Sequence, residues 1–312
     1  MTPYDKELPA PQIPDRLTGN PIEVGGITVK CISSNVRRTD IPWDEMQIAP
    51  GIGSEGNLVI VEALSNSGFR AEIENQFGRD EKIYQGDRFV AVLANRHSGT
   101  SESGDIPTEG INISEGTEIH LLAAGAIVGI KSGVPGKFTE PLPLKTLGLI
   151  THNDKPVDLI ELCGEHHEFL GPSAPVIMVC GTSAEVGKTT TSAAIIRALK
   201  SEEMQVAGTK FTGTGRMRDI LSLRDAGATP WLDFPDVGLA TTYTSPGRFI
   251  KGIYTLFNYI NAGNPDIIVA EAGGDLIEAN VPAFLESQEL MQNIKAIVLV
   301  AGDVMGMMGA VA

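Results

Sequence analysis

The distribution of apolar residues divides the chain into two parts with different patterns. Before about residue 170, short apolar runs alternate with glycine-containing turns, and no segment before residue 150 sustains the 3.6-residue period of an amphipathic helix. The runs that predict strands are "ITVKCI" (27–32), "NLVIVEAL" (57–64), "RFVAVLAN" (88–95) and "TEIHLLAAGAIVGIKS" (117–132). We therefore expect a β-rich domain over residues 1–170, built as a small barrel or a sandwich.

Two polar segments interrupt this first part. "RHSGTSESGDIPTEG" (96–110) is rich in glycine and polar residues, and it predicts an exposed loop that is either a mobile linker or a binding loop. "SGVPGKFTEPLPLK" (132–145) predicts a connector, because its prolines disfavour both a helix interior and a central strand.

From about residue 172 onward, strands alternate with amphipathic helices. Runs of continuous apolar character, which are typical of parallel strands covered on both faces, are "PVIMVC" (175–180), "MQVAGTKF" (204–211), "PDIIVAEAGG" (265–274) and "IKAIVLVAGD" (294–303). The predicted helices are "KTTTSAAIIRALKSEE" (188–203) and "GRFIKGIYTLFNYINAG" (247–263). This alternation predicts a doubly wound α/β domain with a mostly parallel sheet over residues 171–312.

Composition narrows the classes of partner. The chain has 39 acidic and 24 basic residues, a formal charge of -15, so its surface should repel nucleic acid and anionic lipid. It has no run of 18 apolar residues and no apolar signal core at its start. The 3 cysteines (Cys31, Cys163 and Cys180) are too widely spaced for a disulfide framework. We expect a cytoplasmic protein that binds neither nucleic acid nor membranes.

The segment with the clearest chemical pattern is "GTSAEVGKTTT" (181–191), directly after the apolar run "APVIMVC" (174–180). A strand, a glycine-bounded loop and a helix starting at Gly-Lys-Thr form a cradle for phosphate, to which the helix N-terminus adds partial positive charge and Lys188 a full charge. The hydroxyl of Thr189 is placed to bind Mg²⁺. We expect Lys188 to be exposed at the helix start. The expected nucleotide-binding residues are Gly181, Thr182, Ser183, Ala184, Glu185, Val186, Gly187, Lys188, Thr189 and Thr190.

The spacing of this loop is longer than the standard pattern, with five residues between its glycines instead of four. In this, and in its Glu-Val-Gly-Lys-Thr core, "GTSAEVGKTT" resembles the phosphate loop of dethiobiotin synthetase. Later segments resemble strands of that family in the order its fold requires: "VAGTKFTGTG" (206–215), "IIVAEAGGD" (267–275) and "VLVAGDVMGMMGA" (298–310). The resemblance covers about 174–312, and a sister family of P-loop proteins is the alternative, because 223–243 has no counterpart there.

The resemblance implies an ATP site, with GTP as the alternative, and Mg²⁺. Lys210 matches the lysine that holds the substrate near the γ-phosphate, and Glu271 matches the glutamate that holds Mg²⁺ together with Thr189. Asp219 or Asp225 loosely matches a metal-binding aspartate of the family. The candidate catalytic residues are Lys188, Lys210 and Glu271. The family continues into base-binding loops beyond this point, so we expect the domain to be incomplete at its C-terminus.

The remaining polar residues have two readings each. Lys210 and Glu271 end predicted parallel strands, where open α/β sheets place their ligands. Arg216 and Arg218 either reach a phosphate or a substrate carboxylate, or pair with acids on a helix surface. Weaker candidates for facing the site are Asp275 and Asp303. "CGEHHEF" (163–169) favours a polar linker over a metal site, because no second pair of ligands is visible.

The function we expect is activation of a small carboxylate substrate by phosphorylation, in an ATP- and Mg²⁺-dependent, ligase-like reaction. In this reading the β-rich domain closes over the site or binds the substrate, and the protein is a homodimer. Two alternatives stay open. One is a regulatory or metallochaperone-type NTPase with a partner-binding N-terminal domain, and the other is a small-molecule kinase.

Overall fold

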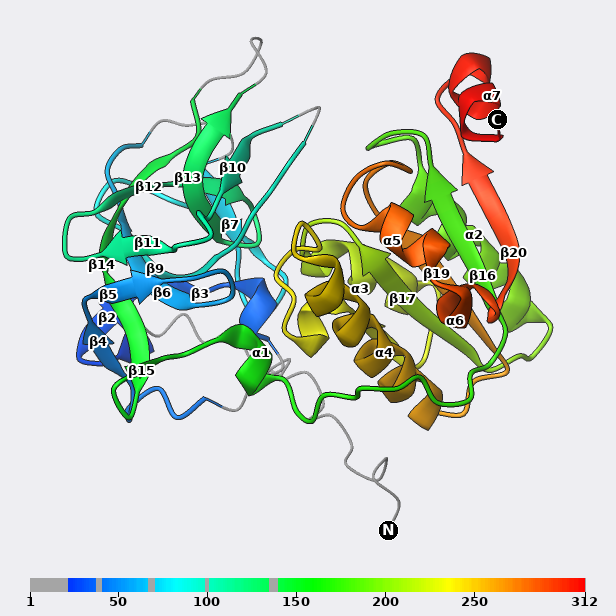
Figure 1. Cartoon of the computed structure of the whole chain (residues 1–312), viewed down its shortest axis with the longest axis horizontal. Helices are drawn as coiled ribbons and strands as arrows, with labels where there is room; N and C mark the ends of the chain where they lie inside the picture. Colours follow the sequence, from blue (N-terminus) through cyan, green and yellow to red (C-terminus); the bar gives the residue numbers. More distant parts are fainter. Residues whose placement is uncertain (1–21, 38–40, 67–70, 99–100, 135–139, 312) are drawn as a thin grey trace. The chain divides into compact units, whose positions relative to one another are not determined.

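The computed structural model describes residues 22–37, 41–66, 71–98, 101–134 and 140–311 (Figure 1). Their contacts divide the chain into two compact units. Among the described residues, the N-terminal unit comprises 22–163 and 238–240, and the C-terminal unit comprises 164–237 and 241–311. The contacts place the division between Cys163 and Gly164, a few residues before the boundary at 170 that the sequence predicts.

The main strands of the N-terminal unit pair into a closed ring. In order around the ring they are β6 (Leu58–Ala63), β9 (Arg88–Leu93), β13 (Ile127–Gly133), β12 (Glu118–Ala123) and β14 (Pro143–His152), and β14 pairs again with β6. The β9–β13 pair is parallel and the other pairs are antiparallel. Such a ring is a barrel, one of the two architectures that the sequence left open.

Short elements complete this unit. The short strands are β1 (Ile22–Val24), β2 (Ile27–Val29), β3 (Cys31–Ile32), β4 (Gln47–Ala49), β5 (Gly51–Gly53), β7 (Glu72–Glu74), β8 (Asp80–Lys82), β10 (Ser103–Asp105), β11 (Ile111–Ile113) and β15 (Lys155–Pro156). The helices are the 3₁₀ turn η1 (Ser34–Val36) and α1 (Leu159–Leu162).

The ring strand β6 is buried on both faces. Side chains alternate between the two faces of a strand, and Val59 and Val61 belong to one apolar cluster while Leu58 and Ile60 belong to another. Burial on both faces explains why β6 and β9 read as continuous apolar runs in the sequence rather than as alternating ones.

Both polar segments of this unit differ from their prediction. Segment 96–110 contains β10, which pairs with β13, and Glu102 is only 3% exposed and forms an ion pair with Arg96 at 3.0 Å. This segment is therefore partly built into the sheet, although residues 99–100 lie outside the described residues. The predicted connector 132–145 includes the end of β13 at Gly133 and the start of β14 at Pro143, while its residues 135–139 lie outside the described ranges. Proline is tolerated as the first residue of a strand.

The C-terminal unit is built on a parallel sheet with the strand order β18-β17-β19-β16-β20. Its strands are β16 (Val176–Gly181), β17 (Val206–Thr212), β18 (Trp231–Asp233), β19 (Ile267–Ala272) and β20 (Ile294–Val300). The helices are α2 (Lys188–Ser201), α3 (Met217–Asp225), η2 (Phe234–Val237), α4 (Pro246–Ala262), α5 (Val281–Glu286), α6 (Gln288–Met291) and α7 (Val304–Val311).

Helices cover both faces of this sheet (Figure 1). On one face, Ile196 of α2 and Ile220 of α3 pack with Val269 of β19. On the other face, Phe211 of β17 stacks on Phe257 of α4 and Phe284 of α5, with ring centroids 4.9 and 5.0 Å apart. The C-terminal unit is therefore a doubly wound α/β domain.

The polar segment that follows Cys163 is fixed to helix α4. Thr255, Asn258 and Asn261 lie three residues apart and so share one face of α4. Their side-chain oxygens accept backbone N–H groups from the segment 167–174 at 2.8–2.9 Å. The segment is thus packed on the C-terminal unit by side chains whose role the sequence does not show.

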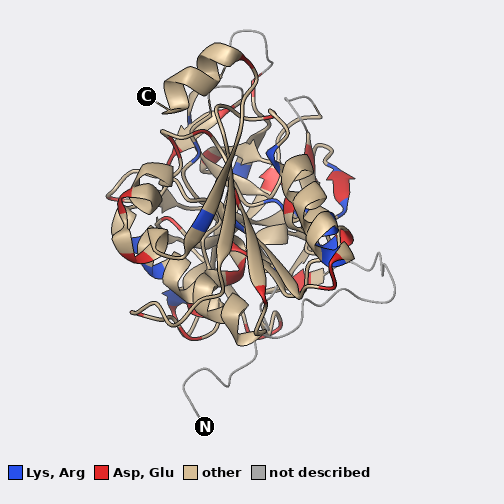
Figure 2. Cartoon of the chain, turned by 90° about the vertical axis from the view of Figure 1, so that its right-hand side faces the viewer, with Lys and Arg blue, Asp and Glu red and all other residues tan. Residues whose placement is uncertain are grey.

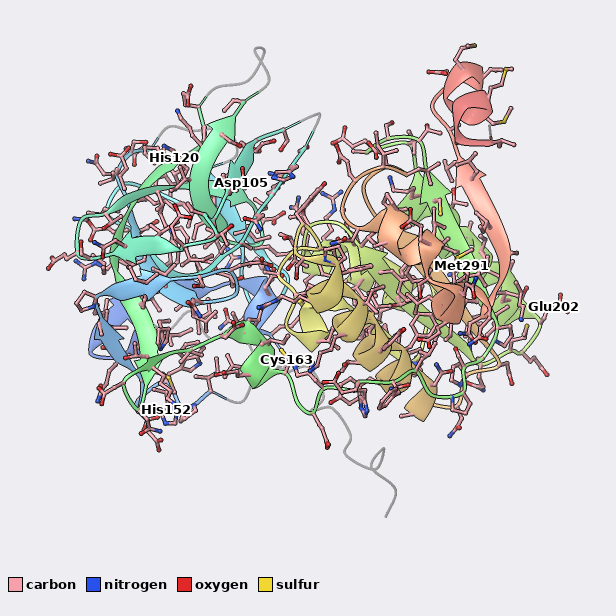
Figure 3. The ribbon with its side chains drawn as sticks, viewed as in Figure 1. Asp105, His120, His152, Cys163, Glu202 and Met291 are labelled. Atoms are coloured by element: carbon pink, nitrogen blue, oxygen red, sulfur yellow. The ribbon has the colours of Figure 1, made fainter. Side chains whose placement is uncertain are left out.

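The structure does not support a metal site in the segment "CGEHHEF" (163–169). Within the described part of the chain, no group of three or more His, Cys, Asp or Glu side chains is arranged to hold a metal ion. Cys163 is buried and follows directly after α1 (Figure 3). The ring of His167 packs edge-on against Tyr259, with centroids 5.5 Å apart.

Helix α7 is apolar and uncharged (Figure 2). None of its residues is buried, and Val304, Met305 and Met308 are 66%, 74% and 60% exposed. The C-terminal unit thus carries an apolar helix on its surface. No helix in the described ranges is both long and apolar enough to cross a membrane.

Candidate functional site

The loop after β16 needs glycine at two positions for different reasons. Gly187 has a φ of +99°, a left-handed conformation that glycine adopts without strain. At Gly181 the limit is space, because an added Cβ would lie 2.8 Å from side-chain atoms of both Val186 and Lys188. The nearest obstacles at Gly181 are therefore side chains of the loop segment itself. Glu185 also has a positive φ, of +64°.

Lys188 is not exposed, contrary to the prediction. It is 6% exposed, and its Nζ donates hydrogen bonds of 2.7 Å to the backbone oxygens of Ser183 and Gly274. The sequence showed only a helix start, but the chain that follows β19 covers the lysine. Burial lowers the pKa of Lys188, and the negative charge of Glu271 opposes that shift. The lysine therefore ties the loop to Gly274.

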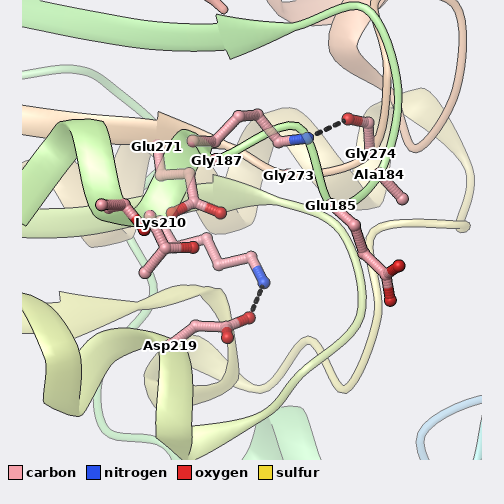
Figure 4. A pocket seen from close by; sticks show the side chains of 11 residues that line it. Ala184, Glu185, Gly187, Lys210, Asp219, Glu271, Gly273 and Gly274 are labelled. Atoms are coloured by element: carbon pink, nitrogen blue, oxygen red, sulfur yellow. Dashed lines mark hydrogen bonds and ion pairs between the residues drawn. The ribbon is translucent and has the colours of Figure 1, made fainter. Parts of the chain in front are cut away.

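A cavity of ≈ 380 Å³ opens beside this loop at the carboxyl ends of the strands (Figure 4). It is lined by Ala184, Glu185, Gly187, Lys188, Thr189, Thr190, Lys210, Asp219, Glu271, Gly273 and Gly274. The structure thus brings together the candidate catalytic residues from three separate segments.

Some predicted residues do not line this cavity. They are Gly181, Thr182, Ser183 and Val186 of the loop, and Asp225, Asp275, Asp303, Arg216 and Arg218 elsewhere. Of the two candidate metal-binding aspartates, Asp219 faces the cavity from the first turn of α3, while Asp225 is exposed at the other end of that helix. The two aspartates lie six residues apart, about 1.7 turns of helix. Their similar sequence contexts, "RMRD" and "SLRD", do not show that they face different surroundings.

Charged side chains form a row across neighbouring strands. Lys210 of β17 is in register with Asp233 of β18 and with Glu271 of β19. Residues in register on parallel strands point to the same face of the sheet. These three are 6%, 0% and 4% exposed, so the row is buried. Buried charges are costly unless paired, and here a lysine lies between two acids.

The side chain of Lys210 is confined by two glycines and reaches an acid of α3. An added Cβ at Gly273 would lie 2.7 Å from Lys210 Cε, and one at Gly213 would lie 3.4 Å from it. Beyond them, Nζ donates to Oδ2 of Asp219 at 2.5 Å. Burial by itself lowers the pKa of Lys210, but the charges of Asp219 and Glu271 outweigh it and raise the pKa. Lys210 is therefore a fixed positive charge.

Gly273→Ala is expected to lower the free energy of unfolding by about 1–3 kcal/mol, the usual cost of overpacking a tight site. The new methyl group would lie 2.4 Å from the backbone oxygen of Thr212, which cannot move without disturbing β17. Urea denaturation measures the change. The control is Gly247→Ala near the start of α4, where nothing lies within 4 Å of the added Cβ. Equal stability of the two variants would contradict the close approach.

Glu271 and Thr189 present a carboxylate and a hydroxyl to the same cavity. Burial raises the pKa of Glu271, and the positive charge of Lys210 opposes the shift. The side chain of Thr189, which lines the same cavity as Glu271, also acts to lower the pKa of its carboxyl group. A buried carboxylate near a hydroxyl, beside the glycine-bounded loop, fits the preference of Mg²⁺ for oxygen ligands.

Comparison with known proteins does not assign a family. No family model matches the sequence, and no curated protein does. Among solved structures, the signal recognition particle receptor FtsY from Elizabethkingia anophelis matches with a TM-score of 0.27 and 19% identity, over 47% of this chain and 51% of that one. The same receptor in complex with GDP matches with a TM-score of 0.26 and 19% identity, over 45% of each chain.

This chain spans about half the length of those structures. With no family model matching, the resemblance to dethiobiotin synthetase stays a hypothesis. The assignment of the site rests on its own geometry. A buried strand, a glycine-bounded loop and a helix that begins at Lys188, with an acid at the end of the adjacent strand, are the parts of a P-loop domain.

Proposed function

We propose that the C-terminal unit binds a Mg²⁺-nucleotide and transfers its terminal phosphoryl group. The observation that supports this most is the single cavity that joins the loop lysine Lys188, the second lysine Lys210 and the Thr189–Glu271 pair. Phosphoryl transfer depends on positioning and on positive charge around the transferring group, and these residues supply both.

Each side chain has a defined task in this proposal. The N-terminus of α2 and the backbone N–H groups of the loop bind phosphate oxygens. Lys188 exchanges its two carbonyl partners for phosphate, since hydrogen bonds between charged groups are stronger than those to neutral carbonyls. Thr189 and Glu271 would hold Mg²⁺, which neutralises phosphate charge when bound. Lys210 stabilises negative charge near the transferring group.

The finer proposal concerns the acceptor. Following the resemblance to dethiobiotin synthetase, we propose a small carboxylate whose oxygen attacks the γ-phosphorus of ATP. The bond from the γ-phosphorus to the β-phosphate oxygen breaks and ADP leaves. An amine then attacks the carbonyl carbon of the acyl phosphate and displaces inorganic phosphate. Lys210 supports this because its ammonium has three N–H donors and Asp219 takes one of them. GTP is the alternative nucleotide, and a stable phosphorylated product would indicate a kinase.

One contact favours a second candidate, a regulatory NTPase. Lys188 is bound to the carbonyl of Gly274, so a phosphate that takes over this lysine would release the chain after β19. Nucleotide hydrolysis that is slow alone and accelerated only by a protein would support this candidate. Hydrolysis accelerated by a small carboxylate, with release of inorganic phosphate, would support the ligase-like reaction.

The experiment that tests the proposed function is Glu271→Gln. The amide keeps the shape of the side chain and removes the charge that Mg²⁺ needs. We expect a raised Mg²⁺ requirement and nucleotide turnover at least about tenfold slower, which corresponds to about 1.4 kcal/mol. Titration of Mg²⁺ in a phosphate-release assay, with ATP and with GTP, measures both. Glu286→Gln, an exposed acid at the end of α5, is the control. Unchanged Mg²⁺ dependence would give Glu271 a structural role instead.

A further inference from the structure

Three carboxylates compete for the ammonium group of Lys210. Asp219, Glu271 and Asp233 all act on it through their negative charge. Among the described residues, only Asp219 is hydrogen-bonded to it, at 2.5 Å. Figure 4 shows the Lys210 side chain pointing toward Asp219 rather than toward Glu271. The choice of partner therefore has to be explained.

Lys210 pairs with Asp219 because of the lengths of the side chains and the elements from which they extend. Glu271 and Asp233 come from the strands on either side of β17, at the same register as Lys210, so they extend in the same direction. The four methylenes of lysine carry its ammonium past these shorter side chains. The acid that meets it there is Asp219, which lies in the first turn of α3, a position where the helix dipole favours a negative charge.

We propose that Asp219 is a positioning residue for Lys210 and is not a ligand of the metal. It holds the ammonium of Lys210 away from Glu271, so that the Glu271 carboxylate stays available with Thr189 for Mg²⁺. The proposal rests on the proposed function, because it assigns parts within that site. It replaces the metal-binding role that the sequence suggested for Asp219.

The geometry supports this division of roles. Asp219 Oδ2 is already occupied by Lys210, and its side chain is 30% exposed, whereas Glu271 is 4% exposed and lines the cavity together with Thr189. If Asp219 lost its charge, the strongest remaining attraction on Lys210 would come from Glu271. A lysine paired with Glu271 would compete directly with Mg²⁺ for that carboxylate.

The test is a double-mutant cycle on metal binding. Mn²⁺ binding in the presence of ADP is measured by electron paramagnetic resonance for the wild type, Asp219→Asn, Lys210→Met and the double variant. We expect Asp219→Asn to weaken Mn²⁺ binding on the order of tenfold when Lys210 is present, and to have no effect in the Lys210→Met background, because two groups that act through one contact are coupled. Asp219→Glu, which keeps the charge, should restore part of the affinity.

Each other outcome has a distinct meaning. Equal weakening by Asp219→Asn in both backgrounds would make Asp219 a metal ligand and overturn the proposal. Unchanged Mn²⁺ binding in Asp219→Asn, with Lys210 present, would also overturn the proposal. Failure of the wild type to bind Mn²⁺ with ADP would instead overturn the proposed function. Asp225→Asn, an exposed acid on the same helix outside the cavity, is the matched control, and circular dichroism verifies that every variant is folded.

Discussion

Lys188→Ala is expected to weaken Mg²⁺-nucleotide binding on the order of a hundredfold, about 2.7 kcal/mol. In the proposed site this ammonium supplies the loop's full positive charge, and hydrogen bonds to charged groups are stronger than those between neutral groups. Isothermal titration calorimetry with Mg²⁺-ATP and Mg²⁺-GTP measures the change. Lys295→Ala, an exposed lysine of β20, should bind nucleotide like the wild type.

The burial of Lys188 adds an effect on stability. Removing it leaves the carbonyls of Ser183 and Gly274 without this donor, so unfolding should become easier by about 1–3 kcal/mol. Lys188→Met keeps the apolar stem against Gly181 and separates the loss of charge from the loss of packing. Both variants should lose nucleotide binding to the same degree. An identical thermal shift with Mg²⁺-ATP in Lys188→Met and in the wild type would refute the phosphate-loop assignment.

Lys210→Ala is expected to bind Mg²⁺-nucleotide within a few-fold of the wild type but to turn over on the order of a hundredfold more slowly. A group that acts mainly in the transition state costs rate more than ground-state binding when it is removed. The loss of one electrostatic stabiliser typically has about this size, roughly 10²–10³. Calorimetry and steady-state phosphate release, with and without a panel of small carboxylates, separate the two quantities.

Lys210→Arg should not rescue turnover. The stem of Lys210 passes Gly213 and Gly273, and a planar guanidinium cannot replace a compact ammonium in so narrow a passage. Lys210→Ala should also lower the free energy of unfolding by about 3–5 kcal/mol, because it leaves the buried carboxylates of Asp233 and Glu271 without the lysine that lies between them. If Lys210→Ala retains full carboxylate-stimulated turnover, the role carried over from dethiobiotin synthetase is wrong and the regulatory candidate takes its place.

The parts that the sequence predicted well are those that depend on neighbours in the chain. The strand predicted over 175–180 is β16 (Val176–Gly181), and the helix predicted over 188–203 is α2 (Lys188–Ser201). The β14 strand escaped prediction, because its run starts at Pro143 and includes the polar residues Lys145 and Thr146. Its strand character comes from pairing with β6 and β12, which are distant in sequence.

The sequence by itself determined the strand, loop and helix around Lys188, and the two strands that carry Lys210 and Glu271 near their ends. A Gly-Lys-Thr turn and an apolar run with one charged residue near its end are local patterns. The sequence also placed Lys210 and Glu271 at the carboxyl edge of a parallel sheet, which follows from the alternation of strands and helices. These positions need no knowledge of which distant segments meet.

Only the tertiary structure decided what these residues contact. Lys188 is buried because Gly274, 86 residues later in the chain, lies over it. Lys210 pairs with Asp219 and not with Asp225, because the first turn of α3 faces the cavity and its last turn faces solvent. The physical reason is common to both. A local pattern sets the direction in which a side chain leaves the backbone, whereas its partner depends on packing between elements that the pattern does not connect.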